Sequence, residues 1–326
     1  MYPEPRKKLF PSPKKRLSSR RKAVTVCIAG INYSQPSPII IVACDRKISF
    51  FGGYFTAEGI AMKVTGINRN WSLMCAGPTS PLVPLVEAIK EGMAKQKATG
   101  GVRRFARQCS NIYKAERPAL IESEVLVDYG IDTYAEYLDT KKSEPQLYAA
   151  ITEKIKEEEE KWSLLFAGFD SKKQPHIFVV SERGRIQYCD TEGFAAIGSG
   201  GWRSLVALSS YQFKRNLPFS QAVFGIAAAK FAAESEAEGV GKETILAILE
   251  PKTKASPVMS DRRMDSLKAL WSNLPRFPKE AEAEVWDGIN EMTFIPEVKN
   301  NPLFRAFLVR QREVRPLTSQ TSVPVP

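Results

Sequence analysis

Branched and small side chains alternate along the segment 24–30, and this pattern predicts a β-strand with two different faces. Val24, Val26 and Ile28 lie on one face, and Ala23, Thr25, Cys27 and Ala29 lie on the other. A turn segment with two prolines, 32–38, leads into a continuous apolar run at 39–44 that is typical of a strand covered on both sides. The two runs together predict a buried β-hairpin.

The rest of the pattern predicts strands and helices in a mixed order. A strand over 71–76 precedes a helix from about 82 to 97, and a charged, mostly helical segment at about 118–161 reads as an insertion. The elements expected after it are strands at 164–169, 176–181 and 186–189, helices at 198–211 and 220–236, and a last strand at 245–249. This order predicts two sheets between two helical layers.

The charge of the chain is concentrated at its start. The 326 residues carry a formal net charge of +11, and residues 1–22 contribute nine basic side chains against the single acidic residue Glu4. This Pro-, Ser- and Lys/Arg-rich extension cannot bury enough apolar surface to fold, so residues 1–24 are predicted to be disordered. It holds only two aromatic residues, Tyr2 and Phe10, and nucleic-acid binding is not expected from the basic extension alone. No apolar run approaches the ~20 residues needed to cross a bilayer, and no membrane association is expected.

Cysteine and histidine usage excludes several kinds of chemistry. The five cysteines are far apart and show no C-x-x-C spacing, which argues against a disulfide framework and a zinc site and favours a reduced, cytoplasmic protein. His176 is the only histidine. Mechanisms built on Ser-His-Asp or Cys-His would depend on it alone, and no cofactor or metal is expected.

Several segments, taken in order, resemble one protein family. Asp45 and Arg46 end the second strand of the hairpin, Lys63 falls 18 residues later, and Gly77 follows in Cys75-Ala76-Gly77. Further on, the run 165–170 precedes Gly198-Ser199-Gly200. Together these segments resemble the proteasome-type N-terminal-nucleophile hydrolases, the family of the 20S proteasome α and β subunits. The resemblance implies a four-layer αββα sandwich, of the α/β (α+β) class, over residues 25–250.

The resemblance also implies roles for particular residues. Thr25 would be the nucleophile and its free α-amine the base, Lys63 would favour the alkoxide, and Asp45 would hold Lys63 in place. The backbone amide of Gly77 would stabilise the oxyanion. The family's supporting serine is matched by Ser199, and its acidic residue is matched loosely by Glu234 or Glu236, with Ser235 between them. Each residue also has a local reading: Asp45 as a turn carboxylate, Lys63 as an edge-strand charge and Ser199 as a helix N-cap.

The residues before Thr25 depart from the family pattern. With residues 1–24 attached, the nitrogen of Thr25 is an amide and cannot serve as a base. The extension is therefore interpreted as a propeptide cleaved between Val24 and Thr25, or as a mis-assigned start if Val24 is a GTG initiator. A register that places Ala23 at the nucleophile position would leave no hydroxyl.

Three functions follow from this reading. The first is a threonine-type peptidase that hydrolyses polypeptides or small amides and assembles into a homo-oligomeric ring or dimer. The second is a non-catalytic structural subunit of a proteasome-like assembly, and the third is a non-proteolytic amidohydrolase. The segment 251–326 is predicted to be a partly disordered C-terminal extension.

Overall fold

The computed structural model describes residues 25–46, 48–50, 55–57, 63–77, 79–94, 101–160, 162–236, 240–251 and 258–273. The predicted basic extension 1–24 lies outside these residues, as does most of the predicted C-terminal extension 251–326. Both interpretations therefore stay predictions.

Four antiparallel strands form the first sheet, in the order β10-β1-β2-β11. Their bounds are Cys27–Asn32 for β1, Ile39–Asp45 for β2, Phe194–Ile197 for β10 and Thr244–Leu249 for β11. The pair β1 and β2 is the predicted hairpin, and all its strand residues are buried. Strand β10 was not predicted, because a strand of 4 residues is too short to show a clear period of two.

The second sheet has five antiparallel strands in the order β5-β6-β7-β8-β9. These strands are Val64–Gly66, Trp71–Ala76, Ser163–Phe169, Pro175–Ser181 and Arg185–Tyr188. The last three form the predicted meander. Two further strands, β3 (Ile48–Phe50) and β4 (Phe55–Ala57), pair with each other and, among the described residues, with no other strand.

Alternate side chains of β1 enter two different cores. Cys27 and Ala29 lie in a core between the sheets, together with residues of the second sheet such as Leu165. Ile28 lies in the core that the first sheet shares with helices α5 and α6. The small residues predicted for one face of this strand are therefore the ones that face the other sheet.

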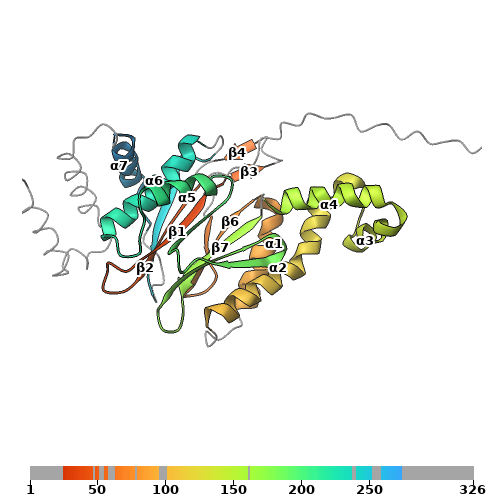
Figure 1. Ribbon diagram of the computed structural model, residues 1–326, viewed down its shortest axis with the longest axis horizontal. Helices are drawn as coiled ribbons and strands as arrows, with labels where there is room; N and C mark the ends of the chain where they lie inside the picture. Colours follow the sequence, from red (N-terminus) through yellow and green to blue (C-terminus); the bar gives the residue numbers. More distant parts are fainter. Residues whose placement is uncertain are drawn as a thin grey trace, which may run out of the picture.

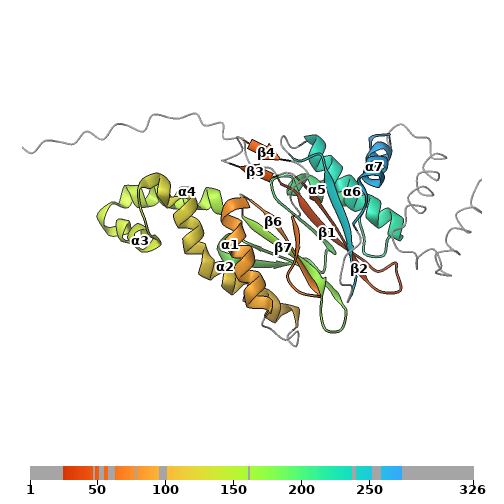
Figure 2. The same ribbon diagram turned by 180° about the vertical axis from the view of Figure 1, so that it is seen from behind.

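Helices cover the outer side of each sheet (Figures 1 and 2). On the first sheet lie α5 (Gly201–Ser210) and α6 (Phe219–Glu236), and α7 (Asp261–Asn273) packs on α6 through Met264 and Leu267. On the second sheet lie α1 (Thr79–Ala94) and α2 (Val102–Glu124). The prediction of a mixed α/β fold with two antiparallel sheets is confirmed.

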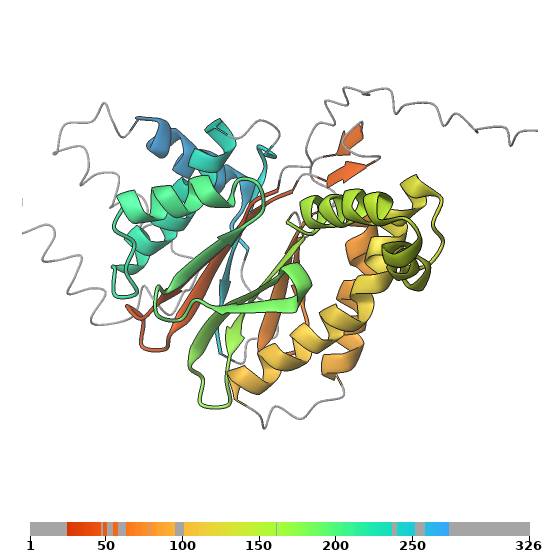
Figure 3. The same ribbon diagram turned by 45° about the vertical axis from the view of Figure 1, so that its right-hand side comes forward.

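The charged helical segment forms an arm beside α2. It contains the 3₁₀ turn η2 (Leu126–Tyr129), α3 (Tyr134–Ser143) and α4 (Pro145–Glu159). Arg117 of α2 pairs with the buried carboxylate of Glu159 and donates to the Tyr134 hydroxyl at 3.1 Å. These contacts hold the end of α4 where the chain turns into β7, next to the sheets (Figure 3).

None of the helices in the described part of the chain is both long and apolar enough to span a membrane.

Candidate active site

Asp45 and Lys63 form an ion pair that joins the two sheets. Asp45 is the last residue of β2 and is fully buried, whereas Lys63 directly precedes β5. Lys63 Nζ lies 2.9 Å from Asp45 Oδ2, and Asp45 Oδ1 accepts a hydrogen bond of 3.0 Å from the backbone N–H of Val26. Both oxygens of the carboxylate are thus engaged, which is what a buried charge requires. The two local readings, a turn carboxylate and an edge-strand charge, do not describe this pair.

The hydroxyl of Thr25 lies beside this ion pair. Lys63 Nζ donates a hydrogen bond of 3.1 Å to Thr25 Oγ1. Cys27 pairs with Cys44 in the register of β1 against β2. Side chains two residues apart along an extended chain lie on the same face, so Thr25 points into the space between the sheets, as Cys27 does. The structure therefore brings together the hydroxyl of Thr25, the ammonium group of Lys63 and the carboxylate of Asp45.

The loop between β10 and α5 holds the backbone of Thr25. The N–H of Thr25 donates to Ser199 Oγ at 3.3 Å, and its carbonyl accepts from the N–H of Gly200 at 3.2 Å. Gly198 has a φ of +89°, and a Cβ at this residue would lie 2.2 Å from the carbonyl oxygen of Thr25. Only glycine fits there. The N-cap of α5 is Gly200, so Ser199 is not the helix cap of its local reading.

This close approach leads to a stability prediction for Gly198→Ala. The added methyl group meets backbone in a conformation that L-residues avoid, so we expect the free energy of unfolding to fall by about 3 kcal/mol. Gly66→Ala is the matched control, since a Cβ at Gly66 meets nothing within 4 Å and its effect should stay within about 0.5 kcal/mol. Urea denaturation of both variants measures the difference. If both variants lost the same free energy of unfolding, a glycine at position 198 would not be required for the contact with the backbone of Thr25.

Gly77 lies at the wall of the same site. It follows the last residue of β6 directly, has a φ of +132° and lines a cavity together with Thr25. This backbone conformation favours glycine, which agrees with its place in the predicted Ala-Gly segment.

Glu234 and Ser235 are not joined to this network. The buried carboxylate of Glu234 pairs with Lys230 at 2.7 Å and with Lys268 of α7. Ser235 is exposed and donates to the carbonyl of Ala232 in its own helix. The side chain of Glu236 lies outside the described residues. The contacts of Glu234 therefore tie α6 to α7, and the catalytic role predicted for Glu234 and Ser235 has no contact with Thr25 to support it.

Lys230 is a buried charge that sequence reasoning missed. Its ammonium group is inaccessible to solvent and donates to Glu234 and to the carbonyls of Gly241 and Lys242. Burial lowers the pKa of Lys230, although the hydrogen bond and charge of Glu234 act in the opposite direction. The only sign of this buried charge in the sequence was a lysine within the apolar run of α6. Its hydrogen bonds hold the segment that leads into β11.

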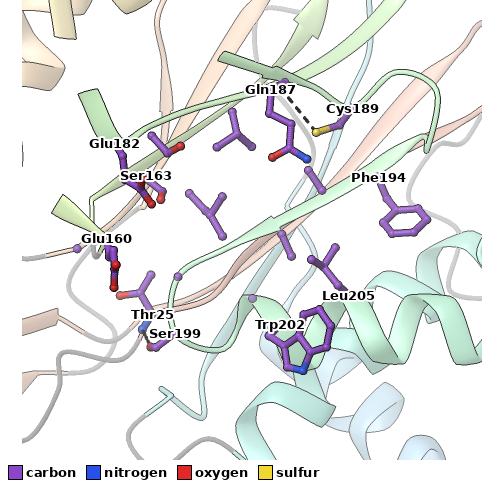
Figure 4. A pocket seen from close by; sticks show the side chains of 18 of the residues that line it. Thr25, Glu160, Ser163, Glu182, Gln187, Cys189, Phe194, Ser199, Trp202 and Leu205 are labelled. Atoms are coloured by element: carbon purple, nitrogen blue, oxygen red, sulfur yellow. Dashed lines mark hydrogen bonds between the residues drawn. The ribbon is translucent and has the colours of Figure 1, made fainter. Parts of the chain in front are cut away.

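A cavity of about 800 Å³ opens beside Thr25, and we refer to it as the Thr25 cavity. Figure 4 shows Thr25 and Ser199 at one end of it, with Trp202 and Leu205 of α5 on one side and Glu160, Ser163 and Glu182 on another. Sequence reasoning did not find the acidic residues, because they come from segments far from Thr25 in the chain. The cavity gives a substrate room next to the hydroxyl.

The only histidine of the chain lies in a separate cluster. His176 Nδ1 is 2.7 Å from Asp190 Oδ2, and its Nε2 is 3.6 Å from Asp170 Oδ2. Although burial opposes the charged form, the hydrogen bonds and charges of Asp190 and Asp170 raise the pKa of His176. His176 does not line the Thr25 cavity. The chemistry available at Thr25 is therefore that of a hydroxyl, a lysine and a carboxylate.

Comparison with known proteins shows a related fold. No protein-family model matches the chain. No curated protein matches it by sequence. Among solved structures, the fold is similar to that of the Gly-1 mutant of Anbu from Hyphomicrobium sp. strain MC1, with a TM-score of 0.54, 15% identity, and coverage of 77% of this chain and 95% of that chain. The chain thus has a fold similar to that of Anbu, and at this identity the likeness concerns the fold alone.

The assignment to the family of the 20S proteasome α and β subunits is corrected by these findings. No family model supports it, and the structural likeness is to Anbu at low identity. The segments that suggested it lie at or next to strand ends, within β7 and just before α5. Such segments follow the fold and do not identify a family.

Proposed function

We propose that this chain is a threonine-type amide hydrolase, a peptidase in the widest sense, in which Thr25 is the nucleophile once it is the first residue. The observation that carries the proposal is the position of Lys63 Nζ, within hydrogen-bond distance of both Thr25 Oγ1 and Asp45 Oδ2. A cation fixed next to a hydroxyl favours the alkoxide form, and the buried carboxylate keeps that cation in place.

The proposed reaction has two steps. Thr25 Oγ1 attacks the carbonyl carbon of the substrate, and its proton passes to the free α-amine, whose ordinary pKa is about 7.7–8.0. The backbone N–H of Gly77 stabilises the oxyanion of the tetrahedral intermediate, a contribution of about 3 kcal/mol for a single donor in other hydrolases. The C–N bond then breaks, the leaving amine takes the proton from the α-amine, and an ester on Thr25 remains. Water hydrolyses this ester and restores the hydroxyl.

Release of residues 1–24 is part of the proposal. Ser199 Oγ already accepts a hydrogen bond from the nitrogen of Thr25, so it would orient the amine that cleavage creates. Cleavage after Val24, or a start at that codon followed by removal of the initiator methionine, would produce this terminus. Without it the site lacks its base, and the chain would act as the non-catalytic subunit that we considered as an alternative. A non-proteolytic amidohydrolase would use the same residues and differ in substrate.

Three further predictions are kept as part of the proposal. The arrangement of the layers is proposed to be an αββα sandwich, supported by the separate cores on the two sides of each sheet. A homo-oligomer, to be checked by light scattering, is supported by the exposed apolar residues Val206 of α5 and Tyr211 directly after this helix. A cytoplasmic location is supported by Cys27 and Cys44, which remain free thiols at directly paired positions.

Covalent labelling tests the proposed function directly. A β-lactone probe acylates a reactive hydroxyl by opening its ring, so the protein gains the whole mass of one probe. We expect a chain that begins at Thr25 to gain one probe mass at Thr25, as measured by intact and peptide mass spectrometry. The control is the full chain from Met1, which should remain unlabelled because its Thr25 nitrogen is an amide. Equal labelling of both chains, or of neither, would contradict the proposal.

A further inference from the structure

The lining of the Thr25 cavity carries charge of one sign. Its charged residues are all glutamates: Glu157, Glu160, Glu182 and Glu192. No lysine or arginine of the described residues lines it. The glutamates come from three places in the chain, the end of α4, the 3₁₀ turn η3 (Glu182–Gly184) and the loop before β10. The fold thus gathers negative charge at the site where the nucleophile lies.

Not all of these carboxylates are available to a ligand. Glu157 pairs with Lys154 at 3.2 Å on the same helix. Within the described part of the chain, no ion pair occupies Glu160 or Glu182. Both lie with Ser163 on one side of the cavity in Figure 4, and Thr25 lines the same cavity. We call Glu160 and Glu182 the acidic wall.

The opposite side of the cavity is apolar. Trp202 and Leu205 of α5 and Phe194 of β10 line it, and Trp202 is 71% exposed. A long basic side chain suits such a space, because its aliphatic stem packs on apolar surface while its charged end reaches a carboxylate. An arginine or lysine can also stack on an indole ring.

We propose that the Thr25 cavity selects substrates with a basic side chain, arginine or lysine, next to the amide bond that is cleaved. The proposal rests on the proposed function for the location of the reacting bond. A concave surface with one sign of charge raises the local concentration of ligands of the opposite sign and favours them once bound. The acidic wall recognises the cationic end of the side chain, and Trp202 contacts its stem.

Binding tests the selection independently of catalysis. We use the Thr25→Ala chain that begins at residue 25, and two fluorescent peptides that differ only in arginine or citrulline, which has the same shape without the charge. We expect fluorescence anisotropy to show the arginine peptide binding about tenfold more tightly, given two partly exposed carboxylates. The preference should shrink in 0.5 M salt because exposed charges are screened.

Two variants locate the preference on the wall. The double variant Glu160→Gln, Glu182→Gln should bring the ratio of the two affinities close to one. The control is Glu153→Gln of α4, whose side chain is 70% exposed, pairs with Lys156 and does not line the cavity. This control should leave the ratio unchanged. Equal binding of both peptides to the parent chain, or an unchanged ratio in the double variant, would overturn the inference.

The outcomes for the inference and for the proposed function are separate. If the β-lactone labels Thr25 but both peptides bind equally, the hydrolase stands and the selection is wrong. If the arginine peptide binds selectively but the probe does not label Thr25, the cavity binds basic peptides without the chemistry.

Discussion

A chain that begins at residue 25 and carries Thr25→Ala is expected to lose amide hydrolysis, with kcat reduced on the order of 10⁶-fold, the cost of removing a hydrolase nucleophile. The substitution removes the oxygen that forms the bond to the substrate carbon. It leaves the α-amine, the Lys63–Asp45 pair and the backbone contacts of Ser199 and Gly200 in place. The fold should therefore remain, and unfolding in urea checks this. Hydrolysis of a fluorogenic peptide amide measures the activity.

Thr25→Ser is the matched control for this loss. It keeps the hydroxyl and the α-amine and removes one methyl group, so measurable activity should remain.

In the parent chain, kcat/KM should rise with pH as the α-amine becomes neutral, in the range of its ordinary pKa of about 7.7–8.0 or below it, because the Lys63 charge nearby favours the neutral amine. Unchanged activity in Thr25→Ala would show that another group is the nucleophile.

Lys63→Met is expected to lower kcat about 10²–10³-fold, the range for removing one donor from a preorganised site. Methionine has similar bulk, but it neither donates to Thr25 Oγ1 nor carries the charge that favours the alkoxide. Asp45 would then be a buried carboxylate without its partner, which costs about 3–5 kcal/mol of stability. Steady-state kinetics and urea denaturation of the same preparation separate the two effects.

The double variant Asp45→Asn, Lys63→Met distinguishes charge at the nucleophile from stability. Asparagine can still accept from the N–H of Val26 and leaves no unpaired charge, so we expect the stability to recover while kcat stays low. If the activity recovered with the stability, Lys63 would be a structural residue only.

The sequence predicted the strands and helices where the pattern is long and the environment uniform. The hairpin of β1 and β2 is an example, since a strand covered on both faces must be apolar along its whole length. Helix α6 is another, because it is buried in the core on the outer side of the first sheet. Short elements such as β10 were missed, because their formation depends on pairing with β1 and not on their own period.

For the candidate site, the sequence by itself determined which side chains are present to take part in the chemistry. Thr25, Asp45, Lys63, Gly77 and Ser199 could be named because the ordered segments that contain them resemble a known family; local patterns alone gave several of them other readings. Whether they meet was decided by the tertiary structure, since the register of β1 against β2 and the packing of the two sheets bring Lys63 to Thr25. Glu234 shows the limit of local reasoning. Its loose match to the family's acidic residue suggested a catalytic role, but its carboxylate pairs with Lys230 of the same helix and Lys268 of α7.

The acidic wall belongs wholly to the tertiary structure. Glu160 stands in a run of four glutamates, which along the chain predicts only a solvated helix end. The ion pair of Arg117 with Glu159 holds that end of α4 near the second sheet, and the turn after β8 brings Glu182 to the same cavity. Charge acts through distance in space, and the distance between residues far apart in sequence is set by packing. The sequence therefore determined which kinds of residues are available around the nucleophile. The fold decided which of their charges a substrate would meet.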